Sequence, residues 1–462
     1  MARNEQRRRT IRRRAAAVVT ALLITATGTA IATAPAVAAA APAAPPHGAA
    51  ADIRALLAAV PGLSVHAEHV LDGGDRQYTL TFRQWADHRD HTRGTFEQRL
   101  NLIHHSLDAP TVLYSTGYEL DESDGTSEPT RLLGGNELKI EHRFFGPSTP
   151  ARPDWSTLTV RQSADDYHAV VTALKRVYRR KWIGTGWSKG GMASVYHRRF
   201  HPQDVDGTVA YVAPHDVDDG DDRAYDRFLA TVGTAQCRAD VQRVSRQLLT
   251  HREALGARLE AWAKEQGYTY TATFGTADRA LEFMAMESVF AYWMLWGEDG
   301  CDKIPVADAN LDTLWGWLHF SLDGLDGYTD QRIGAHAAYY YQAATQIGSP
   351  SPAFSWLDDL RRYPDVYDIR NRLPQQLRGA APDRTAMRDI QDWIDREGSR
   401  LLFVYGQWDP WGSERFSTGR RTRDSEVLTV AGATHGTTAL AGLPEEARTR
   451  AEGMVKRWAR PR

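Results

Sequence analysis

One stretch of this sequence has the residue types and spacing that nucleophilic catalysis requires. Gly186-Trp187-Ser188-Lys189-Gly190 matches the pattern G-x-S-x-G, in which the central serine occupies a sharp turn between a strand and a helix. Side chains two residues before and after the serine would collide in that turn, and glycine removes them. The residues before the motif favour a strand and those after it favour a helix. We therefore predict that Ser188 is a nucleophile; an ordinary turn between a strand and a helix is the alternative.

Two residues much later in the chain could complete a catalytic triad with Ser188. A serine nucleophile needs a general base and an acid that orients this base, and with this motif the usual chain order is serine, acid, histidine. Asp409 follows the apolar run 401–405, and His435 is the only histidine after it. We predict that His435 is the base and that Asp409 holds its tautomer. An Asp-Pro turn and a surface histidine are the respective alternatives.

The reaction of such a serine also needs donors for the negative charge that develops on the substrate oxygen. We expect the backbone N–H of Lys189, the residue after the nucleophile, to be one donor. The second donor should come from the loop after the apolar run 112–114, at Gly117 or Tyr118. For the Lys189 side chain we expect a solvated or structural role rather than a catalytic one.

The order of predicted elements indicates how these residues are positioned. The first half begins with antiparallel strands and continues with strands and helices in alternation, which predicts a mostly parallel sheet with helices on both faces. Its predicted strands are 63–71, 77–85, 96–105, 110–115, the first part of a strand and turn over 138–146, the strand that precedes Ser188, and 207–212. Its predicted helices are 165–178 and one from the serine motif to about residue 200.

A long helical region then interrupts this alternation. Between about residues 215 and 398 we expect helices at 243–266, 280–295, 313–320, 333–341 and 386–397, before strands return at 401–406 and 426–430 and a last helix covers 444–458. This pattern is typical of an α/β-hydrolase whose lid is inserted between two strands. We predict one hydrolase domain from 52–214 and 399–462, with a lid at 215–398.

The first residues have the features of an export signal. A basic run that ends at Arg14 precedes an apolar stretch and the segment Ala36-Val37-Ala38, which resembles a cleavage site. We predict a signal peptide over 1–38, a disordered linker or pro-segment over 39–51, and a secreted protein with no membrane contact after cleavage. In an oxidising compartment Cys237 and Cys301 should form a disulfide; two unrelated thiols are the alternative.

Composition excludes several other classes of function. The chain has 56 Lys and Arg against 58 Asp and Glu, so it lacks the net positive charge of a protein that binds nucleic acid electrostatically. The sequence contains no H-E-x-x-H motif, no zinc spacing of cysteines and no glycine-rich phosphate loop. We therefore expect no metal, no cofactor and no nucleic-acid partner, and we expect a monomer.

Several sequence blocks together resemble the secreted bacterial prolyl tri/tetrapeptidyl aminopeptidases, which are serine peptidases more distantly similar to lysosomal Pro-Xaa carboxypeptidase. The blocks extend over nearly all of the chain from about residue 51. They are 96–99 (F-E-Q-R), 114–119 (Y-S-T-G-Y-E), 141–146 (E-H-R-F-F-G), 186–191 (G-W-S-K-G-G), 213–217 (A-P-H-D-V), 406–411 (G-Q-W-D-P-W) and 433–436 (A-T-H-G). The resemblance implies removal of tri- or tetrapeptides from free N-termini, with proline before the cut, and carries the family's triad onto Ser188, Asp409 and His435.

An exopeptidase of this kind needs a carboxylate for the substrate's free amino group. The candidates are Glu119, Glu141 and Asp216, the last in an acidic run at 216–222 that could equally be a solvated loop. Aromatic rings such as Trp187 and Trp408 could contact proline, although core packing is the more ordinary role for most such rings. A lipase or esterase on the same fold, and a hydrolase-like binding protein without activity, are the alternative functions.

Overall fold

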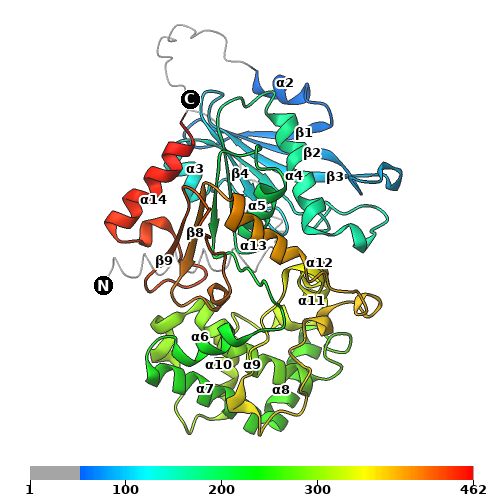
Figure 1. The fold of residues 1–462 in the computed structure, drawn as a ribbon. Helices are drawn as coiled ribbons and strands as arrows, with labels where there is room; N and C mark the ends of the chain where they lie inside the picture. The colour runs from blue at the N-terminus through cyan, green and yellow to red at the C-terminus, as the bar shows by residue number, and fades with distance from the viewer. Residues whose placement is uncertain (1–51, 461–462) are drawn as a thin grey trace, which may run out of the picture.

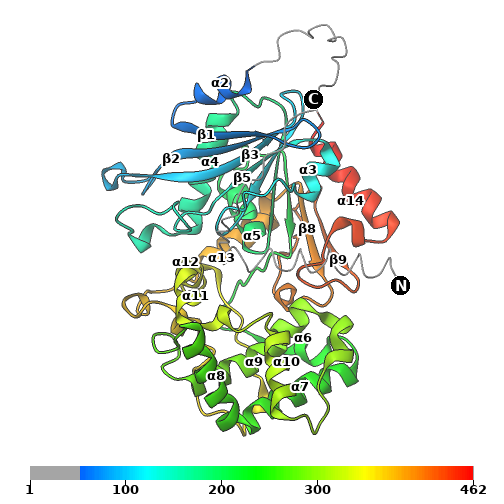
Figure 2. The same cartoon turned by 180° about the vertical axis from the view of Figure 1, so that it is seen from behind.

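The computed structural model describes residues 52–460, so the predicted signal peptide and linker lie outside the described residues. Figures 1 and 2 show two parts: a sheet flanked by helices, and a group of helices that lies along one edge of this sheet. The sheet has nine strands in the order β1-β2-β3-β5-β4-β6-β7-β8-β9. No helix in the described part has the length and apolar character needed to cross a membrane.

The first three strands form an antiparallel ribbon, as the sequence predicts. Strand β1 (Leu63–Val70) pairs with β2 (Arg76–Trp85), and β2 pairs with β3 (Thr95–His104). Strand β3 then pairs in antiparallel with β5 (Asn136–Ile140). This last strand ends at Ile140 and 141–146 forms a turn, which agrees with the strand and turn predicted over 138–146.

The remaining strands are parallel, and their carboxyl ends meet at one edge of the sheet. They are β4 (Thr111–Ser115), β6 (Trp182–Trp187), β7 (Gly207–Tyr211), β8 (Leu401–Gly406) and β9 (Glu426–Val430). The mostly parallel sheet confirms the predicted fold class. Residues that follow β6, β8 and β9 are thereby brought to the same edge.

Helices cover both faces of the sheet. One face is packed by α3 (Glu128–Leu133) and α14 (Glu445–Trp458), whose apolar side chains join those of β6 to β9 in one core. The other face is packed by α2 (Ile53–Ala58), α4 (Val160–Leu174), α5 (Lys189–Phe200) and α13 (Ala386–Glu397). Burial of strands on both faces explains their continuous apolar runs.

Most of the chain between β7 and β8 forms the separate helical part, which we call the cap, whereas α13 at the end of this segment packs on the sheet. Its helices are α6 (Arg223–Thr231), α7 (Ala235–Thr250), α8 (Arg252–Gln266), α9 (Ala277–Leu295), α10 (Leu311–Ser321), α11 (Asp330–Ala335) and α12 (Ala337–Gln342). The predicted helix 243–266 is wrong as a single element, because His251 separates α7 from α8. The predicted helix 333–341 is likewise divided at His336.

A disulfide fastens the first helices of the cap. Cys237 on α7 is bonded to Cys301, which follows α9, across a separation of 64 residues. Cys237 packs in the same apolar cluster as Tyr292 and Trp293 of α9. The predicted pairing is therefore confirmed.

Loss of this disulfide should destabilise the cap before the sheet. Closing a loop of this length restricts the unfolded chain, and removal of such a bond typically costs about 2–5 kcal/mol. In the double variant Cys237→Ser/Cys301→Ser we expect a lower Tm by differential scanning calorimetry. Hydrogen exchange should show faster exchange in α7 and α9 than in β6. Equal losses of protection in sheet and cap would contradict this expectation.

Candidate active site

The nucleophile motif forms the expected turn between β6 and α5. Ser188 has φ +53° and ψ −125°, a backbone conformation that L residues rarely adopt, and its N–H donates to the carbonyl of Tyr211 at 2.9 Å. A Cβ atom at Gly186 would overlap the backbone of Gly190, and one at Gly190 would overlap the carbonyl of Ser115. The two glycines are therefore required by the close approach of β4, β6 and α5.

Asp409 and His435 form a directly bonded pair at the same edge of the sheet. Asp409 lies just after β8 and His435 just after β9. His435 Nδ1 and Asp409 Oδ2 are 2.8 Å apart, and the side chain of Asp409 is fully buried. The backbone N–H of Trp411 also donates to Asp409, at 3.1 Å. A buried carboxylate bonded to Nδ1 leaves Nε2 as the nitrogen that can accept a proton.

A cap helix helps to fix the position of His435. The backbone N–H of His435 donates to the carbonyl of Met294, near the end of α9, at 3.0 Å. The indole N–H of Trp411 reaches the sulfur of the same methionine at 3.1 Å. The sequence does not reveal this contribution of α9, because the spacing of apolar residues in a helix does not show what the end of the helix contacts.

The loop after β4 lies against the first turn of α5. Gly117 has φ +77°, and a Cβ atom at this position would overlap the backbone of Lys189 and Gly190. The backbone N–H groups of Tyr118 and Lys189 do not donate to any other described residue. Two free N–H groups beside a helix N-terminus are suited to bind a developing oxyanion.

The side chain of Lys189 is buried, which corrects the solvated alternative and favours a structural role. Its ammonium donates to the carbonyl of Gly117 at 2.6 Å and lies 5.4 Å from the ring centre of Tyr118 and 5.1 Å from that of Phe145. Burial lowers the pKa of Lys189 well below its ordinary value. The side chain thus holds the loop that carries Gly117 and Tyr118.

Two of the three predicted amine-binding acids have other surroundings. Glu141 is buried, and its carboxylate accepts bonds from the N–H of Leu120 at 2.8 Å and the hydroxyl of Ser148 at 2.6 Å. These bonds hold the turn after β5. Glu119 is exposed beside the loop of Tyr118.

Asp216, the third acid, lies in a buried pair of carboxyl groups. It follows β7, interacts with Glu414 from the loop after Asp409, and its Oδ1 atom is buried without a hydrogen-bond partner. Burial, and then the charge of Glu414, raise the pKa of Asp216. The pair therefore retains a proton that separate surface carboxyls would lose. Sequence analysis missed Glu414, which no motif connects with Asp216.

The two tryptophans predicted to contact proline are half-buried, and each packs against neighbouring residues of the chain. Trp187 stacks on Tyr211 with ring centres 5.4 Å apart. Trp408 lies over Gly297 of the cap and Gly432 of the loop before His435. Both rings therefore border the elements that carry the triad residues.

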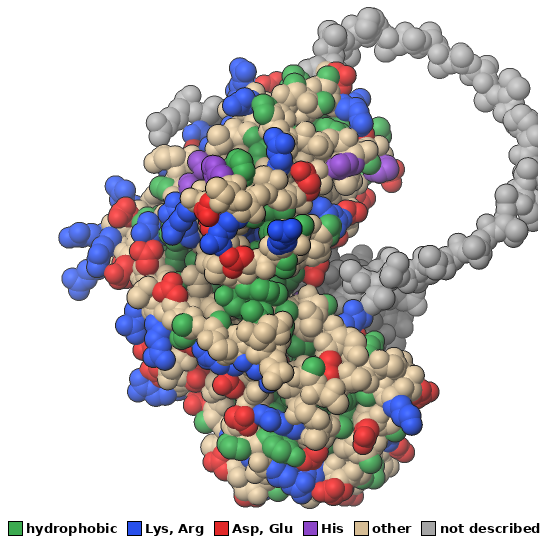
Figure 3. Space-filling model, turned by 90° about the vertical axis from the view of Figure 1, so that its right-hand side faces the viewer, with side chains coloured by type: hydrophobic (Ala, Val, Ile, Leu, Met, Phe, Trp, Pro, Cys, Tyr) green, Lys and Arg blue, Asp and Glu red, His purple; other side chains and the backbone are tan. Residues whose placement is uncertain are grey.

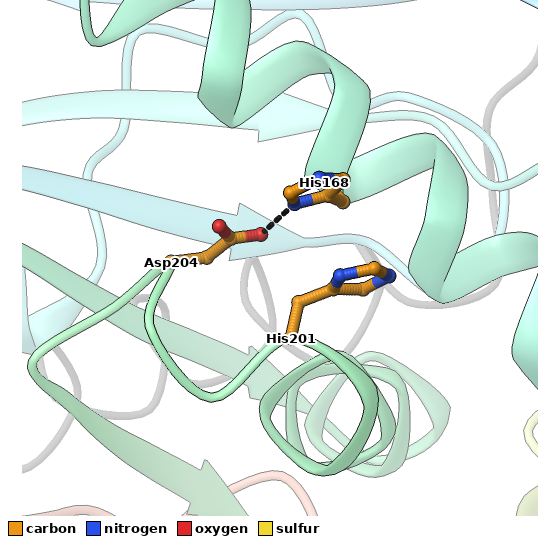
Figure 4. Close-up of side chains that lie close together, drawn as sticks. All are labelled: His168, His201 and Asp204. Atoms are coloured by element: carbon orange, nitrogen blue, oxygen red, sulfur yellow. Dashed lines mark hydrogen bonds and ion pairs between the residues drawn. The ribbon is translucent and has the colours of Figure 1, made fainter.

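His168, His201 and Asp204 form the group with the spacing closest to that of a metal site in the described part (Figure 4). Their hydrogen bonds account for them without an ion. Asp204 accepts from His168 at 2.8 Å and from His197 at 2.8 Å, and His201 is bonded to Asp165 at 2.7 Å. They lie at the far end of α5 from Ser188. We interpret this cluster as a set of structural hydrogen bonds that hold α4 against α5 and the turn after it.

Charge on the surface is mixed in sign. Figure 3 shows Lys and Arg side chains interspersed with Asp and Glu side chains on both parts of the molecule. The sequence as a whole carries a formal net charge of −2.

The sheet, the strained serine turn and the acid–histidine pair define this chain as an α/β-hydrolase. The sequence matches a family described as PS-10 peptidase S37 over residues 45–461. The chain belongs to this peptidase family, which confirms the resemblance seen in the sequence blocks, and it is a serine peptidase.

One relative that covers most of the chain agrees with this assignment. The chain is 40% identical over 411 residues to a prolyl tri/tetrapeptidyl aminopeptidase from Streptomyces mobaraensis, with 88% of this chain and 85% of that protein covered. It is 31% identical over 134 residues to prolyl carboxy peptidase like protein 5 from Caenorhabditis elegans, with 25% and 26% covered. Among solved structures, proline iminopeptidase from Mycobacterium smegmatis matches with a TM-score of 0.35 and 14% identity, over 79% of this chain and 96% of that one.

The contact of Gly117 with α5 should make this position intolerant of any side chain. In Gly117→Ala the new methyl group would displace the backbone of α5 or of its own loop, and φ +77° adds strain. We expect kcat to fall by about 100-fold, the loss typical of one oxyanion donor, because the substitution would move the N–H of Tyr118, which the sequence predicts to be such a donor. Steady-state kinetics and circular dichroism test this. Gly379→Ala, where a Cβ atom meets nothing within 4 Å, is the control.

The buried acid pair should make stability depend on pH. Because the folded state raises the pKa of Asp216, it binds a proton that the unfolded state releases, so stability falls as pH rises above the ordinary value of 3.8. Asp216→Asn removes this loss. We expect the variant to gain more than about 1 kcal/mol relative to wild type between pH 5 and pH 8 in urea unfolding. A difference between the two proteins that is constant with pH would contradict the assignment.

Proposed function

We propose that this protein is a secreted exopeptidase that releases tri- or tetrapeptides from the free N-termini of peptides, preferring proline before the cut. The observation that carries the proposal is the 40% identity, over 88% of this chain, to a protein named for this activity. The predicted export signal and the disulfide between Cys237 and Cys301 are consistent with secretion.

We propose Ser188, His435 and Asp409 as the catalytic triad. Ser188 attacks the carbonyl carbon of the third or fourth residue while Nε2 of His435 takes its proton. The bond of Nδ1 to Asp409, 2.8 Å long, holds the tautomer that leaves Nε2 free and stabilises the imidazolium that forms. His435 then gives the proton to the leaving amine, and the acyl-enzyme remains on Ser188.

The N–H groups of Lys189 and Tyr118 are the proposed oxyanion donors, with Gly117 allowing their loop and helix to meet. They stabilise the negative oxygen of the tetrahedral intermediate. Water, deprotonated by His435, then attacks the acyl-enzyme and releases the short peptide and Ser188. The cap would exclude bulk water from these steps.

Loss of the nucleophile should abolish turnover without loss of the fold. In Ser188→Ala we expect kcat/KM on a tripeptidyl anilide that ends in proline to fall by at least about 10⁴-fold, because the acyl-enzyme cannot form. Ser156→Ala, at an exposed position, is the matched control. Mass spectrometry of products from peptides with free and acetylated N-termini tests the exopeptidase directly. Equal cleavage of both sets, or cleavage of long-chain esters alone, would refute the proposal.

A further inference from the structure

After its first turn, helix α9 carries two acids, Glu282 and Glu287, in a mostly apolar sequence, and their surroundings differ. Glu282 is buried and fully partnered: Arg252 donates to it at 2.8 Å, and the N–H groups of Arg362 and Tyr363 donate at 2.8 and 2.9 Å. Glu287 is half-buried, and the hydroxyl of Tyr367 is its one hydrogen-bond donor among the described residues. Glu282 thus has a structural role that Glu287 does not share.

The surroundings of Glu287 contain a cation that does not neutralise it by direct contact. Burial raises the pKa of Glu287 above its ordinary value, and the guanidinium of Arg372 and the hydroxyl of Tyr367 offset this effect only in part. No ion pair within 4.0 Å joins Glu287 to a basic side chain in the described part of the chain. Arg372 instead lies over the rings of Phe283, Tyr340 and Tyr367. One carboxylate oxygen therefore remains open to a further donor.

The side of α9 that carries Glu287 also reaches the triad. Residues 287, 290 and 294 lie on one side of a helix, since they are three and seven positions apart. The carbonyl of Met294 accepts from His435, and the ring of Phe290 contacts Trp411, two residues after Asp409, at 5.4 Å. Glu287 continues this side of the helix by two turns, away from the triad.

Aromatic residues lie between Glu287 and the loop that carries Gly117 and Tyr118. The charge of Glu287 contributes to the raised pKa of Tyr328, Tyr339 and Tyr340, so these three side chains lie near it. All three are half-buried. The ring of Tyr339 lies 5.8 Å from that of Tyr118. A peptide that extends from Ser188 towards Glu287 would therefore pass rings that can hold its apolar side chains, and the faces of such rings also attract an ammonium group.

The distance along α9 from Met294 to Glu287 matches the length of a short extended peptide. Seven residues of an α-helix span about 10 Å, which separates the level of Met294, and so of His435, from the level of Glu287. Three residues of an extended peptide also span about 10 Å. An ammonium group three residues before the scissile bond would thus reach Glu287, whereas that of a dipeptidyl substrate would stop a few ångströms short.

We propose that Glu287 binds the free α-amino group of the substrate and, by its distance from the triad, sets the length of the peptide released. This proposal rests on the proposed exopeptidase function. Asp216 fits this role less well, because its carboxyl group already interacts with that of Glu414 and this pair retains a proton. Glu141 is occupied by the turn after β5, as described above.

The test compares Glu287→Gln with wild type on tripeptidyl and dipeptidyl anilides, each with a free or an acetylated N-terminus. On the free tripeptidyl substrate we expect kcat/KM to fall by about 100-fold, mostly through KM, because an ammonium–carboxylate contact is lost. The acetylated substrate has no ammonium group, so its rate should change less than about threefold. The preference for tripeptidyl over dipeptidyl substrates should narrow in parallel.

Three further variants make the outcome decisive. Glu260→Gln, on the exposed side of α8, should behave as wild type. Tyr367→Phe keeps the ring and removes only the hydroxyl that donates to Glu287, so it should weaken the free substrate alone, and it remains informative if Glu287→Gln does not fold. Asp216→Asn identifies the competing acid, because a selective loss there in place of Glu287 would overturn the assignment.

The outcomes also separate this inference from the proposed function. If wild type cuts free and acetylated substrates equally, the exopeptidase itself is refuted. If wild type prefers free N-termini and Glu287→Gln keeps both this preference and the length preference, the exopeptidase stands and the role of Glu287 is overturned. Equal losses on free and acetylated substrates in Glu287→Gln would indicate a structural role and would also overturn it.

Discussion

The close approach of three backbone segments around Ser188 is the constraint on which the rest of the site depends. The turn between β6 and α5, the end of β4 and the loop at Gly117 come so near to one another that a single Cβ atom at residue 117, 186 or 190 would overlap a neighbouring backbone. This proximity presents the serine at the tip of its turn and brings the N–H groups of Tyr118 and Lys189 to the same place. The buried side chain of Lys189 donates to the carbonyl of Gly117 and so fixes the position of this loop.

The histidine side of the site depends on the cap in a way that the serine side does not. Ser188 is positioned by the sheet and α5 alone, whereas the backbone of His435 is bonded to Met294 of α9. A movement of α9 would therefore shift His435 relative to Ser188. The same helix carries Phe290 against Trp411, so the loops after β8 and β9 both rest on it. The position of the cap and the geometry of the proposed triad are thus physically coupled.

The sequence was sufficient for those features that depend on local rules. The glycines around Ser188, the order of Asp409 and His435 after their strands, and the switch from alternating elements to helices all follow from short-range geometry, and the structure has them in the predicted places. The break at His251 was missed because apolar spacing continues across it from α7 into α8. Glu414 and Glu287 were missed because their importance comes from the elements they face. For Glu287 one signal existed, an acid within a mostly apolar helix, but Glu282 gave the same signal with a different cause.

Burial alone therefore does not identify a binding acid, and the partners of each acid decide its role. Glu282 has an arginine and two backbone N–H groups, so its charge is fully used within the cap. Asp216 has another carboxyl group beside it, so burial is balanced by a retained proton rather than by a cation. Burial raises the pKa of Glu287, and the guanidinium of Arg372 opposes this effect without contacting the carboxylate. One carboxylate oxygen of Glu287 has no hydrogen-bond donor among the described residues. An ammonium ligand would complete the last arrangement, whereas it would be redundant in the first and would have to displace a proton in the second.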